Sequence, residues 1–136
     1  MNIQNNNLAD KLIELSKKFG SKDTEVIISN NIETNVEARK GKIEYSETAE
    51  NNSITLRVIN DKKSAVVSAN DISEKSLKNL ALKANEIAKE SLENPFDKLA
   101  LIDQLADKSK IIDLDIYDEE NINPINSSIF EEMAIV

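Results

Sequence analysis

Carboxylates are the side chains in this sequence with the clearest capacity for chemistry, and the densest group of them runs from Asp113 to Glu120. A calcium loop needs oxygen ligands at alternating positions, a glycine at the bend and a distal bidentate glutamate. This run has no glycine, and Leu114, Ile116 and Tyr117 within it indicate intermittent burial. We therefore interpret the run as a solvated linker in preference to a weak cation site. Micromolar binding in a calorimetric titration would reverse that preference.

A second group of candidate residues lies in segments that alternate polar with apolar residues. Paired carboxylates can do acid–base catalysis when burial raises the pKa of one of them. Here each glutamate alternates with apolar neighbours, which predicts exposure on the wet side of a strand, where its charge discourages edge-to-edge pairing. Two serines, Ser64 and Ser68, have no imidazole to activate them as nucleophiles. The glutamates concerned are Glu33, Glu37, Glu44 and Glu47.

Missing residue types exclude whole classes of active site. The chain has no histidine and no cysteine, so it cannot form a Ser/His/Asp triad, a Cys/His dyad, an HExxH zinc site or a zinc ribbon. Its two glycines can build neither a GxGxxG nor a GxxxxGK[ST] phosphate loop. We therefore predict no catalytic, cofactor-binding or metal-binding residue in this chain.

The charge balance argues against nucleic acid as a partner. With 25 acidic and 17 basic side chains, the net charge of −8 repels phosphate, and a nucleic-acid surface would need a local basic stripe. The two lysine pairs, Lys17–Lys18 and Lys62–Lys63, are interpreted as solvated charges. The lack of cysteine, of a leader-like N-terminus and of any run near 20 apolar residues predicts a soluble, cytoplasmic protein without a membrane partner.

The hydrophobic periodicity predicts two amphipathic helices, which would position any functional surface of the domain. From about Asn7 to Phe19 leucines recur every three or four residues, with Asn6 or Asn7 as the N-cap and Gly20 as the C′ residue. A second helix is expected from about Ile72 to Leu92, beginning at a capping box of Asp71 and Glu74 or at the competing cap Ser73. Its apolar stripe should cover the inner face of a sheet and comprises Leu77, Leu80, Ala81, Ala84, Ile87, Ala88 and Leu92.

Between these helices, from Thr24 to Ala69, the hydrophobic period changes to two. Together with turn residues every eight to twelve positions, this predicts an antiparallel meander of four or five strands. One reversal is expected at Gly41, which can adopt the positive φ of a tight hairpin. Another is expected at Asn60–Lys63, where Asn60 or Asp61 must supply any left-handed residue. The predicted strand segments are Val26–Ser29, Ile32–Ala38 with its even-numbered residues buried, one with Ile43 and Tyr45, Ser53–Ile59 and Ser64–Ala69.

The predicted fold class is therefore α+β: an antiparallel four- to five-stranded sheet with two main helices on one face, in the order α-β-β-β-β-α. We assign this domain to residues 1–95. Residues 96–124 are predicted to be a linker with a short helix at Phe96–Ala106. Residues 125–136 begin a helical pattern without a C-cap, which suggests the start of a following, truncated domain.

The order of these elements and several local phrases resemble the N-terminal domain of the PmbA/TldD family, described as modulators of DNA gyrase and zinc-dependent peptidases. The resemblance covers nearly the whole chain. Two features lean toward the PmbA (TldE) branch: the Ser68–Asp71 phrase, and Asn94-Pro95 followed by Leu99-Ala100. The glycines usual just before Ile54 and near Lys63 are absent. The matching phrases are Asp23–Val26, Arg39–Glu44, Ile54–Val58, Ser68–Ser73, Ala84–Ala88, Asn94-Pro95 and Asp113–Tyr117.

The resemblance implies a non-catalytic N-terminal domain of a metallopeptidase-complex subunit that takes part in proteolysis of unfolded peptides. It implies a TldD-like partner subunit or a homo-oligomer. It also implies zinc bound through HExxxH only in the catalytic partner or beyond Val136. Two alternatives stay open: a stand-alone adaptor domain that regulates an antitoxin or a gyrase-related partner, and a small carboxylate hydrolase, which the missing histidines and glycines disfavour.

Overall fold

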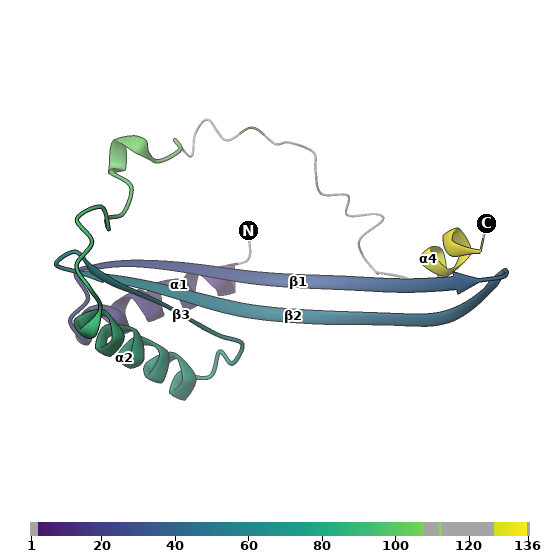
Figure 1. Cartoon of the computed structure of the whole chain (residues 1–136), viewed down its shortest axis with the longest axis horizontal. Coiled ribbons are helices and arrows are strands. Elements are labelled where there is room, and N and C mark those ends of the chain that lie inside the picture. The colour runs from purple at the N-terminus through teal and green to yellow at the C-terminus, as the bar shows by residue number, and fades with distance from the viewer. Residues whose placement is uncertain (1–2, 108–111, 113–126, 136) are drawn as a thin grey trace. The chain divides into compact units, whose positions relative to one another are not determined.

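A computed structural model describes residues 3–107, 112 and 127–135 of the chain. By its contacts the chain divides into two compact units. The first comprises Met1–Asn30 and Asn52–Leu105, and the second comprises Asn31–Asn51 and Ala106–Val136. The elements in order are α1, β1, β2, β3, α2, the 3₁₀ helix η1 and α4 (Figure 1).

Helix α1 spans Ile3–Lys18 and ends as predicted. Lys17 and Lys18 occupy its last turn, where positive charge complements the helix dipole, and Gly20 follows with a φ of +105°. The predicted start was wrong by about one turn, because the helix already includes Asn6 and Asn7. Neither asparagine is therefore the N-cap. Asparagine has only a modest helix penalty, too small to end the helix at that point.

Helix α2 spans Glu74–Glu90, shorter at both ends than predicted. Its N-cap is Ser73, whose side chain accepts a hydrogen bond from the Ser76 backbone N–H. Asp71 accepts from the backbone N–H of Ser73 at 2.8 Å and from its hydroxyl at 2.9 Å. Of the two predicted capping arrangements, the serine cap is therefore correct, and Asp71 orders the turn before it.

The sheet is antiparallel but has three strands, β1 (Asp23–Arg39), β2 (Lys42–Asn60) and β3 (Lys63–Ala69), in the order β1-β2-β3. The α+β class is confirmed, whereas the prediction of four or five strands was too high. The polar pairs at 30–31 and 51–52 lie inside strands. The described non-glycine residues with positive φ are Lys40, Asp61 and Lys62, so the backbone reverses only where a left-handed conformation is present.

Both hairpin turns have two left-handed residues. In the first turn Lys40 and Gly41 have φ of 52° and 71°. The positive φ of Gly41 was predicted from the sequence. Asp61 and Lys62 have φ of 49° and 68°, so Asp61 supplies one left-handed residue as expected and Lys62 supplies another. Asn60 then pairs with Lys63 across this turn.

One hydrophobic core lies between the sheet and the two helices, which lie together on one side of the strands (Figure 1). In the part of β2 that belongs to the first unit, even-numbered residues project into it, and Ile54, Leu56 and Val58 are fully buried. Helix α1 contributes Leu12. The contribution of α2 differs from the predicted stripe, because Ile87 is 50% exposed and Leu92 is 92% exposed. The buried residues of α2 are Leu77, Leu80, Ala81, Ala84, Asn85 and Ala88.

The part of the β1–β2 hairpin in the second unit, residues 31–51, is called the hairpin arm below. The predicted buried face of this segment was wrong: Ile32 is 52% exposed, and Thr34, Val36 and Ala38 are only half-buried. Alternation places these side chains on one face, but no residue of the arm is buried.

After α2 the described chain has little regular structure. The helix expected at Phe96–Ala106 is a single 3₁₀ turn, η1, at Ile102–Gln104. The helical pattern expected from residue 125 is present as α4, Ser127–Ala134. No helix in the described ranges has the length and apolar character needed to cross a membrane.

Candidate functional site

The four glutamates considered as acid–base candidates all lie exposed on the hairpin arm. Glu33 accepts a hydrogen bond from Asn35 Nδ2 at 3.2 Å, and Glu44 lies 4.0 Å from Arg39 Nη1. Glu37 and Glu47 lie near Tyr45. Solvent screens these carboxylates from one another, and the arm therefore presents surface anions.

Tyr45 is the residue of the arm whose titration the structure alters. Its hydroxyl donates a hydrogen bond to the Glu47 carboxylate. That hydrogen bond is the main cause of a pKa of Tyr45 above its ordinary value, with smaller contributions from desolvation and from the charges of Glu47 and Glu37. The contact keeps the phenol protonated, so Tyr45 is not an activated base.

The serines considered as nucleophiles have ordinary hydroxyl partners. Ser68 shares a hydrogen bond of 2.8 Å with Thr55 across the β2–β3 pair. Ser64 donates to the carboxylate of Asp97. A carboxylate is too weak a base to deprotonate a serine hydroxyl efficiently near neutral pH, because a carboxylic acid is a far stronger acid than an alcohol. Both serines therefore serve packing and pairing.

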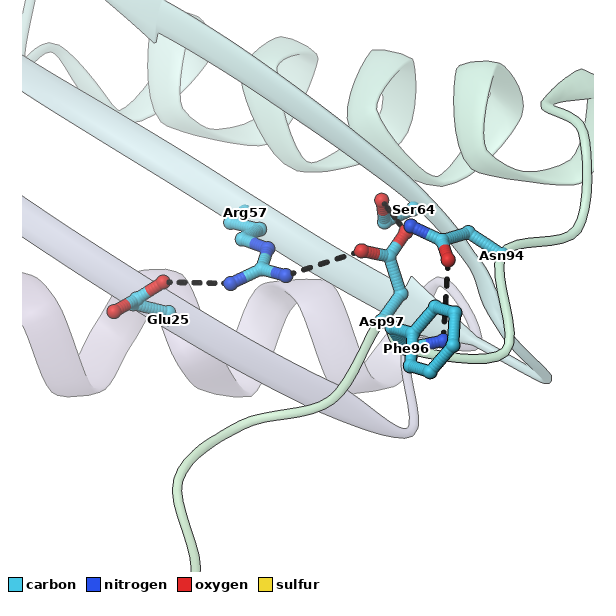
Figure 2. Close-up of polar contacts among 6 residues, drawn as sticks. All are labelled: Glu25, Arg57, Ser64, Asn94, Phe96 and Asp97. Atoms are coloured by element: carbon cyan, nitrogen blue, oxygen red, sulfur yellow. Dashed lines mark hydrogen bonds and ion pairs between the residues drawn. The ribbon is translucent and has the colours of Figure 1, made fainter.

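The Ser64 contact belongs to a polar cluster that sequence analysis missed (Figure 2). We call Glu25, Arg57, Ser64 and Asp97 the outer-face latch. Strand alternation places Glu25, Arg57 and Ser64 on the sheet face opposite the helices, and Asp97, from the segment after α2, contacts Arg57 and Ser64 there. Arg57 Nη2 lies 3.4 Å from Asp97 Oδ1, and Arg57 Nη1 lies 3.6 Å from Glu25 Oε2. Their sequence separation left no local motif by which to find them.

The outer-face latch fixes the segment that follows α2 against the sheet. The backbone N–H of Asn94 donates to the carbonyl of Lys62 at 2.7 Å. The Asn94 side chain accepts from the Phe96 N–H at 3.1 Å (Figure 2). In this arrangement the side chain of Asp97 is 19% exposed and faces the side chain of Arg57, which is 30% exposed. Since Arg57 and Ser64 both satisfy Asp97, the cluster fastens the chain rather than offering a reactive group.

A second missed feature is the buried carboxamide of Asn85, 1% exposed in the middle of α2. Its Nδ2 donates to the Ala81 carbonyl at 2.9 Å and to the Ser16 carbonyl at 3.4 Å. Its Oδ1 accepts from Asn60 Nδ2 at 3.2 Å, while Asn60 Oδ1 accepts from the Lys22 N–H at 2.8 Å. These bonds connect α1, α2 and the β2–β3 turn, and they satisfy the carboxamide. Asn85 is a structural residue.

A groove of about 610 Å³ lies between β3 and the N-terminal half of α2. This volume is in the range of ligand pockets. Val67, Ala69 and Leu80 give it an apolar base, and two lysines, Lys75 and Lys83, line it on the α2 side. We refer to it as the β3–α2 groove.

The described residues gather no donor set for zinc. Structural and catalytic zinc sites need several histidine, cysteine or carboxylate ligands together. The sequence has no histidine or cysteine, and among the described residues no three acidic side chains gather to hold a metal. The acidic run Asp113–Glu120 lies outside the described residues.

Comparison with known proteins gives a family match over the middle of the chain. Residues 24–88 match the family model described as PmbA/TldA metallopeptidase domain 1. This range includes β2, β3, all of β1 except Asp23, and most of α2. No curated protein sequence matches the chain.

Two solved structures resemble the fold. A candidate modulator of DNA gyrase from Bacteroides thetaiotaomicron has a TM-score of 0.87 and 20% identity, covering 98% of this chain and 30% of that one. TldE from Thermococcus kodakarensis has a TM-score of 0.59 and 17% identity, covering 65% of this chain and 20% of that one. The chain thus spans less than a third of either protein.

Proposed function

Residues 24–88 belong to the PmbA/TldA metallopeptidase domain 1 family, and on that premise we propose that the chain is the non-catalytic N-terminal domain of a PmbA/TldD-type peptidase subunit. In this role it contacts the neighbouring subunit and helps to hold unfolded peptide for proteolysis in the cytoplasm. The single observation that carries the proposal is the family match.

The length relation supports a domain that works within a larger protein. The chain aligns with 30% of the Bacteroides protein and 20% of the Thermococcus protein. We propose that zinc and the reaction it supports belong to the partner subunit or to a region beyond Val136, since this chain has no histidine and no cysteine. The TldE likeness favours the PmbA (TldE)-like branch, and an HExxxH motif downstream would instead place the protein in the TldD branch.

The segment after α2 supports the proposed subunit contact. Between residues 92 and 105 a set of large apolar side chains is more than half exposed. Exposed apolar residues are common singly, whereas their concentration in a short segment is typical of a surface that other protein covers. They are Leu92, Phe96, Leu101, Ile102 and Leu105.

Reconstitution of the peptidase tests the proposal. The full-length protein, mixed with a TldD-type partner and zinc, should cleave a fluorogenic unfolded peptide, and a chelator should abolish the cleavage. Absence of cleavage by the zinc-loaded pair would remove the peptidase role.

The apolar segment gives a second, independent measurement. Exchanging Leu92 and Phe96 together for aspartate should lower the fraction of assembled complex in analytical ultracentrifugation, because a contact surface depleted of apolar area binds weakly. Lys98→Asp is the matched control, since Lys98 is an exposed residue of the same segment, and should leave assembly unchanged.

A second candidate function is an adaptor that acts on a gyrase-related or antitoxin partner without proteolysis. The observation that favours it is the likeness over 98% of this chain to the candidate modulator of DNA gyrase. If this function is correct, the 136-residue chain should alter supercoiling by gyrase in the absence of zinc and of any partner subunit. An unchanged supercoiling rate would leave the peptidase-subunit role.

A further inference from the structure

We propose that the outer edge of β3, together with the β3–α2 groove, binds an extended acidic peptide segment by strand addition. This inference rests on the proposed function, because it assigns the contact with unfolded peptide to one edge and one groove. In strand addition, main-chain hydrogen bonds supply affinity and pockets for alternate side chains supply selectivity.

The register of β3 defines which of its backbone groups are available. Asn60 and Lys63 flank the two-residue turn and pair with each other. In such hairpins the flanking pair exchanges both hydrogen bonds, and every second pair after it does the same. Lys63, Ala65, Val67 and Ala69 therefore direct their N–H and C=O groups toward β2. Ser64, Val66 and Ser68 direct theirs away from the sheet.

This edge is open along the part that borders the groove. β3 is the last strand of the sheet, and no described loop forms a backbone hydrogen bond with Ser64, Val66 or Ser68. The outer-face latch reaches only the Ser64 end, through the Asp97 side chain. Val66 and Ser68 can therefore offer two N–H donors and two carbonyl acceptors to an added strand.

The two edges of the sheet differ in their protection. Proteins commonly guard edge strands with charged residues or proline, which oppose unplanned pairing. In the first unit, β1 carries Asp23 and Glu25 in exposed positions. Residues 64–69 of β3 contain no charge and no proline, and Val66 is 60% exposed. The unguarded edge is the one beside the groove.

The charge of the groove selects the kind of peptide. Lys75 and Lys83 lie eight residues apart on α2, about 12 Å along its axis, and neither pairs with an acidic residue in the described part of the chain. The groove also includes Asp71, whose carboxylate accepts two hydrogen bonds from Ser73 and keeps its negative charge, so the two lysines exceed it by one positive charge. In a protein of net charge −8, this local excess of positive charge complements acidic side chains.

Fluorescence anisotropy with the whole 136-residue chain tests the inference. The probe is a labelled nonapeptide that alternates valine with glutamate, and the comparison peptide alternates valine with lysine. The glutamate peptide should bind at least about tenfold more tightly, and added salt should weaken it. Equal binding of the two peptides, or no binding of the glutamate peptide, would overturn the inference.

Two sets of variants locate the contact. Lys75→Glu with Lys83→Glu should raise the Kd about tenfold. Lys78→Glu with Lys89→Glu changes the net charge equally at exposed α2 positions outside the groove and should change the Kd less than about twofold. Val66→Pro removes an outward N–H and is compatible with an edge strand, so it should weaken binding while Val66→Thr preserves it. A melting curve for each variant reports folding, and the charge variants decide the question if the proline variant unfolds.

The outcome separates this inference from the proposed function. If the reconstituted subunits hydrolyse peptide but the Lys75→Glu/Lys83→Glu chain keeps its Kd, the groove assignment is wrong and the peptidase role stands. If the chain binds the glutamate peptide at β3 and the zinc-loaded pair cleaves nothing, the peptidase role is wrong and the groove assignment stands.

Discussion

The β1–β2 hairpin has two regions with the same alternating sequence pattern and different surroundings. Where β2 belongs to the first unit, Ile54, Leu56 and Val58 are fully buried. In the hairpin arm, the corresponding apolar positions are half-buried or exposed, and Ile32 is 52% exposed. The alternation of polar and apolar residues along a strand shows which side chains share a face of the sheet. Burial of that face depends on neighbouring elements, and in the first unit α1 and α2 pack against it.

This difference predicts unequal stability along one pair of strands. Burying apolar area contributes about 25 cal/mol per Å², and among the described residues the core cluster lies in the first unit, where α1, α2 and all three strands contribute to it. Local opening should therefore be easier in the hairpin arm than at the buried end of β2. The variants below test that inequality, from the largest expected effect to the smallest.

Ala84→Asp should have the largest effect. Ala84 is fully buried in the core, and a carboxylate there has no charged partner to offset its desolvation. We expect a loss of about 4 kcal/mol or more, enough to abolish a cooperative unfolding transition. In the arm, Val36→Asp should lower the free energy of unfolding by less than about 1 kcal/mol. Urea denaturation followed by circular dichroism measures both, and a folded Ala84→Asp protein would contradict the packing described above.

Replacing the buried carboxamide should rank second. Asn85→Leu removes the acceptor of Asn60 Nδ2 and the donor to the Ser16 and Ala81 carbonyls. Leaving buried polar groups without partners costs about 1–3 kcal/mol. Asn35→Ala, the control in the arm, removes only an exposed contact to Glu33 and should be close to neutral. If both variants unfolded at the same urea concentration, the carboxamide would not be a structural link.

Loss of the outer-face latch should rank third. Asp97→Ala removes the acceptor of Ser64 and the closer carboxylate of Arg57, and because these groups are only partly exposed we expect about 1 kcal/mol. The backbone N–H of Asn94 should then exchange with deuterium faster. Glu44→Ala breaks an ion pair in the arm whose side chains are 71% and 54% exposed. That control should leave exchange at Asn94 unchanged, and equal exchange in both variants would argue against the latch.

The elements that could be predicted from sequence are those determined by local chemistry. Gly20 and Gly41 mark positions with positive φ, and the leucines of α1 recur on one face. On α2, Asn85 and Ile87 lie about 80° to either side of Leu77 around the helix axis. Hydrophobicity favours burial of Ile87, whereas the structure buries Asn85. That choice depends on Asn60 and Ser16, which are distant in sequence.

The strand count and the outer-face latch were missed because both depend on contacts between segments that are distant in the sequence. Asn30, Asn31, Asn51 and Asn52 are typical of turns, yet two adjacent strands can pair through them because no positive φ is required there. Asp97 reaches Arg57 across 40 residues of sequence. The β3 edge was predictable only as a general possibility, since the order of strands in the sheet determines which edge stays open.

The smallest expected effect concerns Tyr45 in the hairpin arm, and it tests whether the exposed strands hold a defined conformation in solution. The hydrogen bond to Glu47 raises the pKa of Tyr45. For an acid whose pKa is higher in the folded state, the stabilisation is fully present below the unfolded pKa and is lost as the pH rises through the folded pKa. The arm should therefore loosen only at strongly alkaline pH.

Tyr117, the second tyrosine of the chain, is replaced by phenylalanine so that phenolate absorbance reports Tyr45 alone. Glu47→Gln should then lower the pKa of Tyr45 toward its ordinary value, because the amide is a weaker, uncharged acceptor. Glu33→Gln changes the net charge equally without touching Tyr45 and should leave its titration in place. Identical titrations in all three proteins would mean that the arm does not hold Tyr45 beside Glu47.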